Sequence, residues 1–138
     1  TGAESNNFSL HAFWKPEESS IIPSFSAGIG HSYLSGDFSG KYAKTTSSWM
    51  VGLQWDDVFV EGNSLGGAIG QGQFVSSQNK GMPDDGNYVM ELWYNHQLTD
   101  NISITPAVYW LSRPLGDDTP QGNTFGVLGG VIQTTFKF

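Results

Sequence analysis

The sequence contains no cysteine, which removes disulfides, thiolate metal ligands and cysteine nucleophiles from consideration. It is also poor in charge, because Asp, Glu, Lys and Arg make up 14% of its residues, against roughly a quarter in an ordinary soluble domain. Positive charge is scarcest, with 6 Lys and Arg against 13 Asp and Glu and a net charge of -7. Nucleic-acid binding needs clustered Lys and Arg, so this class of function is excluded.

Long apolar runs are missing as well. No stretch approaches the roughly 18 consecutive apolar residues that a transmembrane helix needs. A membrane β-strand needs only about ten residues of alternating hydrophobicity, and it leaves the mean hydropathy low, as the value of -0.27 is here. No charged and apolar leader opens the chain at Thr1. We therefore expect any secretory signal to have been removed or to lie upstream.

Glycine, with 18 residues, and aromatic side chains, at 14%, are plentiful. Apolar residues alternate with small or polar ones in segment after segment, and this period of two predicts β-strands. The clearest segments are residues 8–14, 24–33, 48–56, 88–97, 102–110 and 128–138. A seventh segment, 64–75, is ambiguous, since Leu65 and Ile69 fall on one face and Ala68 and Phe74 on the other. We predict an all-β chain with a single domain over residues 1–138.

The connections between the predicted strands alternate in length. Those around 35–47, 76–87 and 112–123 are long, and those at 15–21, 57–63 and 98–101 are shorter. Outer-membrane barrels have short periplasmic turns and longer extracellular loops, so the alternation predicts an antiparallel transmembrane β-barrel. Bacterial barrels use even numbers of at least eight strands, so seven should not close. Either an eighth strand lies within residues 1–7, or we expect the chain to be the C-terminal part of a larger porin barrel whose other strands precede Thr1.

One proline argues against this assignment. Pro106 lies inside a predicted strand, where its missing N–H should interrupt the hydrogen-bond ladder. The interruption would be avoided only if Pro106 fell at a bulge or at a sheet edge. The connection 98–101 just before this strand should be a tight hairpin, because Thr, Asp and Asn favour turns.

The alternation predicts two unlike faces. Trp49 and Trp55 stand near the ends of one apolar stripe, as in a strand that crosses a bilayer between two aromatic girdles. The predicted girdle residues are Trp14, Tyr33, Trp49, Trp55, Tyr88, Tyr94 and Trp110. The predicted pore-lining residues, on the opposite parity, are Gln54, Glu91, Asn95, Gln97, Tyr109, Gln133 and Lys137. Such groups would line water and set selectivity by size and charge, although the solvated face of a soluble sheet would look the same.

Three stretches carry a resemblance to a known family. YVMELWYNHQLTDNISITPAVYWLSRP (Tyr88 to Pro114) resembles the carbohydrate-selective porin family of OprB type, in which a strand, a tight turn and a proline-bearing strand recur near the C-terminus. WMVGLQWDDVFVEGNSLGGAIGQ (Trp49 to Gln71) is similar to that family's strand, turn and glycine-rich strand. GVIQTTFKF (Gly130 to Phe138) resembles its cyanobacterial members, which elsewhere carry a surface-layer-homology domain and are often described as iron-uptake porins.

The resemblance implies a channel and not an enzyme, with no cofactor. It implies passive diffusion of small hydrophilic solutes or ions, assembly as a homotrimer, and the cell outer membrane of a Gram-negative-type bacterium, with its lipid and lipopolysaccharide. It also gives Ile132, Phe136 and Phe138 a role, because the barrel-assembly machinery recognises a C-terminal aromatic residue preceded by alternating apolar residues. An ordinary last strand is the alternative reading of these three residues.

Other chemistry has weak support. His11, His31 and His96 lie in separate predicted strands with no acidic residue at metal-ligand spacing, so we expect no metal site. The pairs Asp84-Asp85 and Asp117-Asp118 fall in predicted outer loops, where they could bind divalent cations, although turn formation explains them equally well. Two other functions stay open: a soluble all-β carbohydrate-binding or surface module whose aromatic residues stack on sugars, and a small closed barrel used for adhesion.

Overall fold

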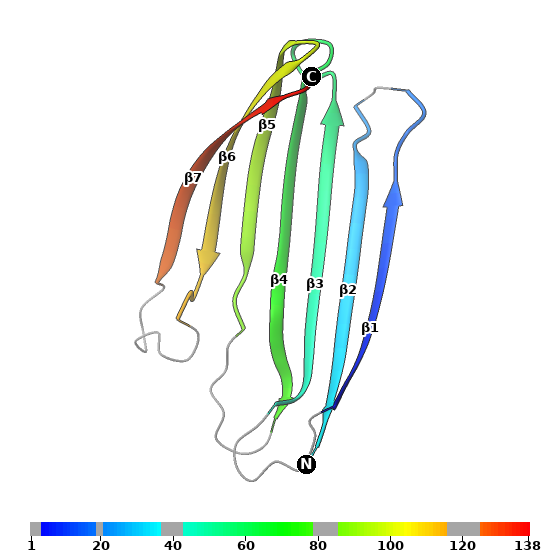
Figure 1. Ribbon diagram of the computed structural model, residues 1–138, viewed down its shortest axis with the longest axis vertical. Helices are drawn as coiled ribbons and strands as arrows, with labels where there is room; N and C mark the ends of the chain where they lie inside the picture. The colour runs from blue at the N-terminus through cyan, green and yellow to red at the C-terminus, as the bar shows by residue number, and fades with distance from the viewer. Residues whose placement is uncertain (1–3, 19–20, 37–42, 79–85, 116–124) are drawn as a thin grey trace.

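The chain folds into one antiparallel sheet whose strands follow each other in chain order (Figure 1). The computed structural model describes residues 4–18, 21–36, 43–78, 86–115 and 125–138. Its strands are β1 (Glu4–Trp14), β2 (Ser24–Ser35), β3 (Ala43–Asp56), β4 (Ser64–Gln78), β5 (Val89–Thr99), β6 (Ile102–Ser112) and β7 (Gly126–Phe136). The described residues include no helix long and apolar enough to span a membrane. The all-β antiparallel prediction is confirmed.

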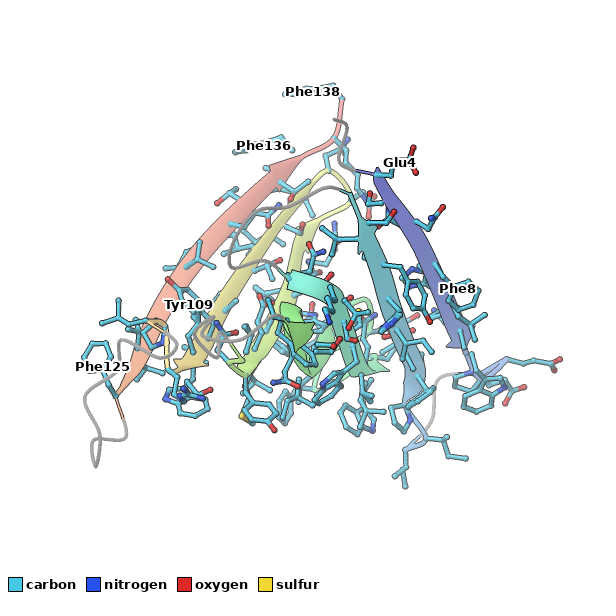
Figure 2. The ribbon with its side chains drawn as sticks, turned by 90° about the horizontal axis from the view of Figure 1, so that it is seen from below. Glu4, Phe8, Tyr109, Phe125, Phe136 and Phe138 are labelled. Atoms are coloured by element: carbon cyan, nitrogen blue, oxygen red, sulfur yellow. The ribbon has the colours of Figure 1, made fainter. Side chains whose placement is uncertain are left out.

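The sheet is curved into an open trough (Figure 2). Phe8 and Phe136 point away from the trough, whereas Tyr109 points into it. The strands contain 11 to 15 residues, and a tilted strand of about 9–11 residues crosses a bilayer. The sheet is not closed, because β1 pairs only with β2 and β7 only with β6. Residues 4–7 belong to β1, so they do not form an eighth strand.

Strand pairing assigns each side chain to one of two faces. We call the outer one the convex face and the inner one the concave face. On β1 the convex face between Phe8 and Trp14 carries no Asp, Glu, Lys or Arg. The same holds for the convex positions of the other described strands that pair with this part of β1, directly or through their neighbours. Its apolar side chains are open to the surroundings, as Leu128 at 76% and Ile132 at 74% exposure show. A large uncovered apolar face marks a contact with a membrane or a protein.

The parity of β4 changes along its length. Trp49 pairs with Gln71 but Ser47 pairs with Phe74, so β4 carries one extra residue between these two pairs. This bulge brings Phe74 to the face of Leu65 and Ile69, which corrects the prediction that it lies opposite them. Gly72 sits in the bulge, where nothing lies within 4 Å of a Cβ position. A bulge shifts the alternation by one residue, which a strict period of two cannot describe.

The predicted contrast between connection lengths holds only in part. The predicted long connection at 35–47 is shorter in the structure. Its polar stretch Thr45 to Ser47 pairs with β2, and β3 begins at Ala43. The connection between β2 and β3 therefore covers residues 36–42, while that between β1 and β2 covers 15–23. Hydroxyl side chains can continue a strand into water, because only its apolar part must match the membrane.

Pro106 lies in an interior strand and at no bulge, so its missing N–H is expected to interrupt the hydrogen-bond ladder there. It pairs with Ile132 of β7, and the β6–β7 register continues through it without a shift. On the side of β5, Ala107 pairs with Trp93 and Ile104 pairs with His96, but Thr105 and Pro106 have no paired position. The ladder between β5 and β6 is therefore interrupted at Pro106. The missing N–H thus opens one gap in the sheet. The hairpin before β6 is tight as predicted, with two residues between β5 and β6.

Candidate functional site

The concave face gathers most of the predicted pore-lining residues. Strand pairing places six of them there: Gln54, Glu91, Asn95, Gln97, Tyr109 and Gln133. Lys137 lies just beyond β7, so the strand alternation does not place it. Its backbone N–H donates to the carbonyl of Asn101 at 2.8 Å, and the Asn101 side chain donates to the Lys137 carbonyl at 2.7 Å. Whether these residues line a pore remains a prediction.

Trp93 is the largest side chain of β5 on this face, and sequence reasoning did not select it. The alternation places Trp93 on the face of Glu91 and Asn95, but neither the predicted girdle residues nor the predicted pore-lining residues include it. Its indole lies against Gly66 of the neighbouring strand, because a Cβ at Gly66 would fall on the ring atoms Cζ2 and Cε2. Gly66 is buried under the ring. The indole ring of Trp93 therefore packs against β4 at Gly66.

A depression of about 330 Å³ lies beside Trp93 on the concave face. Its lining residues are Glu91, Trp93, Thr105, Ala107, Val131 and Gln133. Asn95 donates from Nδ2 to Thr105 Oγ1 at 2.9 Å, which bridges β5 and β6 where the backbone ladder is interrupted. An aromatic ring beside a carboxylate, an amide and a hydroxyl can bind a solute that is apolar on one side and carries hydroxyl groups on the other.

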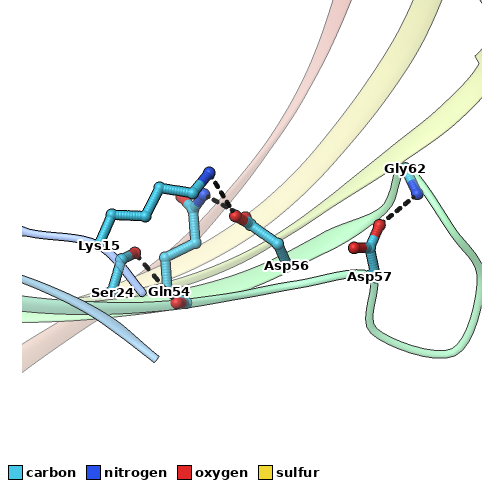
Figure 3. A network of polar contacts seen from close by, with 6 residues as sticks. All are labelled: Lys15, Ser24, Gln54, Asp56, Asp57 and Gly62. Atoms are coloured by element: carbon cyan, nitrogen blue, oxygen red, sulfur yellow. Dashed lines mark hydrogen bonds and ion pairs between the residues drawn. The ribbon is translucent and has the colours of Figure 1, made fainter. Parts of the chain in front are cut away.

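Figure 3 shows an ion pair between Lys15, just after β1, and Asp56 at the end of β3. Lys15 Nζ is 2.7 Å from Asp56 Oδ2, and Gln54 donates from Nε2 to Asp56 Oδ1 at 3.0 Å. The hydrogen bond and the negative charge of Asp56 raise the pKa of Lys15. A depression of about 140 Å³, lined by Lys15, Gln54 and Trp93 among others, separates this pair from the ring. Sequence reasoning missed the pair because Lys15 follows β1 and lies outside the alternation.

The predicted girdle residues lie on the convex face. Strand pairing puts Trp14, Tyr33, Trp49, Trp55, Tyr94 and Trp110 there. Tyr88 stands just before β5, and its ring meets that of Trp49 edge-on with centroids 6.3 Å apart. Trp14, Trp55 and Tyr94 lie toward the end of the sheet with the β5–β6 hairpin, and the other four lie toward the opposite end. Their role as membrane girdles remains a prediction.

The three predicted assembly residues are exposed at the end of the chain. Ile132 pairs with Pro106 and Phe136 with Ile102, both on the convex face. Phe138 follows β7 and is fully exposed. Recognition by the assembly machinery remains a prediction.

The histidines lie in three different strands. His11 stands over Gly28 on the concave face, while His31, on the convex face, is 2.8 Å from the Ser47 hydroxyl. His96 contacts the side chain of Asn63. Among the described residues, no three His, Asp or Glu side chains gather in a way that could hold a metal ion. Asp84-Asp85 and Asp117-Asp118 lie outside the described residues.

Comparison with known proteins settles the family. The model of the carbohydrate-selective porin, OprB family, matches residues 1–138. The chain belongs to this family. OprB porins are channels and not enzymes, which agrees with the apolar convex face and the polar concave face of the sheet.

Two curated relatives are uncharacterized proteins. One, from Nostoc sp., is 28% identical over 136 residues, which cover 99% of this chain and 22% of the relative. Another, from Synechocystis sp., is 34% identical over 91 residues, which cover 64% of this chain and 16% of the relative. The OprB chain thus spans about a fifth of the length of the curated relatives it matches. No solved structure matches it significantly.

Proposed function

We propose that this OprB chain forms part of the wall of an outer-membrane channel for small hydrophilic solutes. One observation carries the proposal: the convex face of the single curved sheet is apolar and uncharged over the middle of the strands, whereas the concave face mixes a few apolar side chains with amides, hydroxyls and the carboxylate of Glu91. A soluble sheet would have to cover the convex face, where Leu10, Ile29, Leu92 and Val108 are 58%, 53%, 52% and 51% exposed. In a bilayer this face meets lipid and needs no cover, while the concave face meets water.

The polar groups of the concave face suit uncharged or cationic solutes. Glu91 supplies a carboxylate, Asn95 and Gln133 supply amides, and Trp93 supplies a ring. Sugars fit this set, because their C–H faces stack on aromatic rings while their hydroxyl groups form hydrogen bonds. A soluble carbohydrate-binding module loses support, since the family is one of channels and most of the tryptophans lie on the convex face.

Further parts of the proposal rest on the family resemblance. The complete protein would lie in the outer membrane of a Gram-negative-type bacterium, in contact with phospholipid and lipopolysaccharide. It would be inserted by the barrel-assembly machinery and would function as a homotrimer that passes solutes by diffusion.

Neighbouring residues of β3 provide the test. In single-cysteine variants of the complete protein in planar bilayers, Gln54→Cys should react with a membrane-impermeant, charged thiol reagent and change the conductance. Leu53→Cys, one residue away on the convex face, is the matched control and should leave the conductance unchanged. Equal responses of the two variants, or no conductance at all, would contradict the proposal.

A further inference from the structure

Two connections at one end of the sheet project large apolar side chains. Ile21 and Ile22, between β1 and β2, are 94% and 59% exposed. Phe59 and Val60, between β3 and β4, are 90% and 54% exposed. We call these four residues the apolar rim. Isolated exposed apolar residues are common, but the same feature in two neighbouring connections indicates a contact surface.

Joining two neighbouring antiparallel strands does not require these residues. At the same end of the sheet, β5 and β6 are joined by only two residues, Asp100 and Asn101. The connection between β3 and β4 covers residues 57–63, five more than this hairpin needs. The additional length is what carries Phe59 and Val60 outward.

Both connections are bound to aromatic residues of the convex face. The Trp55 indole N–H donates to the carbonyl of Ile21 at 2.8 Å, and the Tyr94 hydroxyl donates to the carbonyl of Val58 at 3.1 Å. The ring of Phe59 also lies near that of Tyr94, with centroids 6.2 Å apart. The two connections are therefore held from the convex side of the sheet, and the apolar rim continues that face.

Asn63 fixes the second connection to β5. Its side chain is 1% exposed and donates from Nδ2 to the Tyr94 hydroxyl at 2.8 Å and to His96 Nδ1 at 2.9 Å. Its Oδ1 accepts the backbone N–H of Gln97 at 2.9 Å. A buried amide with its donor and acceptor both used holds one geometry, because breaking any of these bonds leaves a polar group unpaired.

The backbone of this connection is strained. Asp57 and Phe59 adopt left-handed conformations, with φ of 57° and 63°, which residues with a Cβ rarely adopt. Asp57 Oδ1 accepts the N–H of Gly62 at 2.8 Å, which closes the turn. Strained conformations persist only where the surroundings impose them, and they concentrate at functional positions. Phe59 thus combines a strained backbone with a side chain that is 90% exposed.

We propose that the apolar rim anchors the wall in the membrane–water interface, with its side chains among the lipid head groups and the first acyl carbons. This inference rests on the proposed function, because it requires the convex face to lie in a bilayer. Lipid is the occupant that continuity with the convex face favours. The acidic residues Asp57 and Glu61 flank Phe59 and Val60 and would be costly in hydrocarbon, so the anchor stays at head-group depth.

Fluorescence quenching tests the depth of the rim. Phe59→Cys in an otherwise cysteine-free complete protein is labelled with an environment-sensitive fluorophore in vesicles. Its emission should shift to the blue, and a nitroxide on the upper acyl chain should quench it more strongly than aqueous iodide does. The control is Asp100→Cys, in the hairpin at the same end, which iodide should quench more strongly. A label at residue 59 with the quenching profile of residue 100, or one shielded from both quenchers as by a protein partner, would overturn the proposal.

Two more variants separate the possible failures. A label on Leu53→Cys reports the proposed function alone, because lipid nitroxides reach it only if the convex face is in the bilayer. If residue 53 is quenched from lipid and residue 59 is not, the anchor is wrong and the channel wall stands. Tyr94→Phe keeps the aromatic ring at position 94 and removes only the hydroxyl that bonds Asn63 and the Val58 carbonyl, so a spin label at residue 59 should gain mobility. Unchanged mobility would show that the Tyr94 hydroxyl does not hold the rim in place, against the proposal of a fixed anchor.

Discussion

Trp93 and Gly66 meet on the concave face, because the indole ring of Trp93 lies where a Cβ of residue 66 would stand. The two residues come from neighbouring strands that pair at these positions. The glycine thus supplies the space that the ring occupies against β4. Trp93 lines two of the depressions of the concave face, so this contact affects the shape of both.

Gly66→Ala should therefore displace the Trp93 ring and weaken sugar binding in the channel. A loss of about 1 kcal/mol, the order of one aromatic contact, corresponds to roughly fivefold weaker binding. Current-block titration with sugars in planar bilayers measures this. Gly67→Ala is the matched control, since its Cβ would make ordinary contacts at 3.5 and 3.6 Å on the convex side. Equal effects of the two substitutions would argue against a role for Trp93.

Leu53→Arg should destabilise the membrane-inserted protein by about 2 to 4 kcal/mol, as a charge on the lipid side at mid-bilayer does. Leu53 lies on the convex face, paired with Phe25 and Gly67. Gln54→Arg, on the other face, should cost much less. Denaturant unfolding from lipid vesicles gives both values. A spin label at residue 53 that reports water contact would remove the basis of this prediction.

Glu91→Gln should weaken a preference for cations without closing the channel. Glu91 lies on the concave face opposite Tyr109, where its charge acts on ions in the passage. The effect should be largest at low salt, because the screening length grows to about 30 Å at 0.01 M. Reversal potentials under a salt gradient measure the preference, with Glu61→Gln in the β3–β4 connection as control. Unchanged potentials at low salt would show that Glu91 does not face the passage.

Deleting Phe138 should lower the yield of protein in the outer membrane while leaving the inserted protein as stable as before. The side chain is fully exposed, so its loss should cost little folding free energy. Quantitative blotting of outer-membrane fractions gives the yield, and thermal unfolding of the purified protein gives the stability. Phe138→Tyr, which keeps an aromatic end, serves as control. Normal yields from the deletion would speak against an assembly role.

The sequence predicts the number of strands and the face of most side chains, because the alternation of apolar and polar residues is a local property. The bulge in β4 escaped prediction, since it depends on how the strand registers against β3. Trp93 was placed on the correct face but not chosen as a site residue, because large aromatics suit lipid as well as solute. Its significance depends on the space at Gly66, which only the pairing of β4 with β5 reveals.

Asn63 shows a different limit. Its partners Tyr94 and His96 lie some thirty positions away in the sequence, and nothing local marks an asparagine in a turn as buried. Turn chemistry alone explains Asn in such a position. Contacts between distant segments, such as this one, need the three-dimensional arrangement of the strands.

The two open edges of the sheet constrain any complete wall. Neighbouring strands run in opposite directions, so β1 and β7, the first and the seventh, run the same way. These edges cannot join each other in an antiparallel pair, and neither can the edges of two copies placed side by side in the same orientation. Antiparallel closure therefore requires an odd number of further strands between β7 and β1, which makes the total even, as in bacterial barrels formed by one chain.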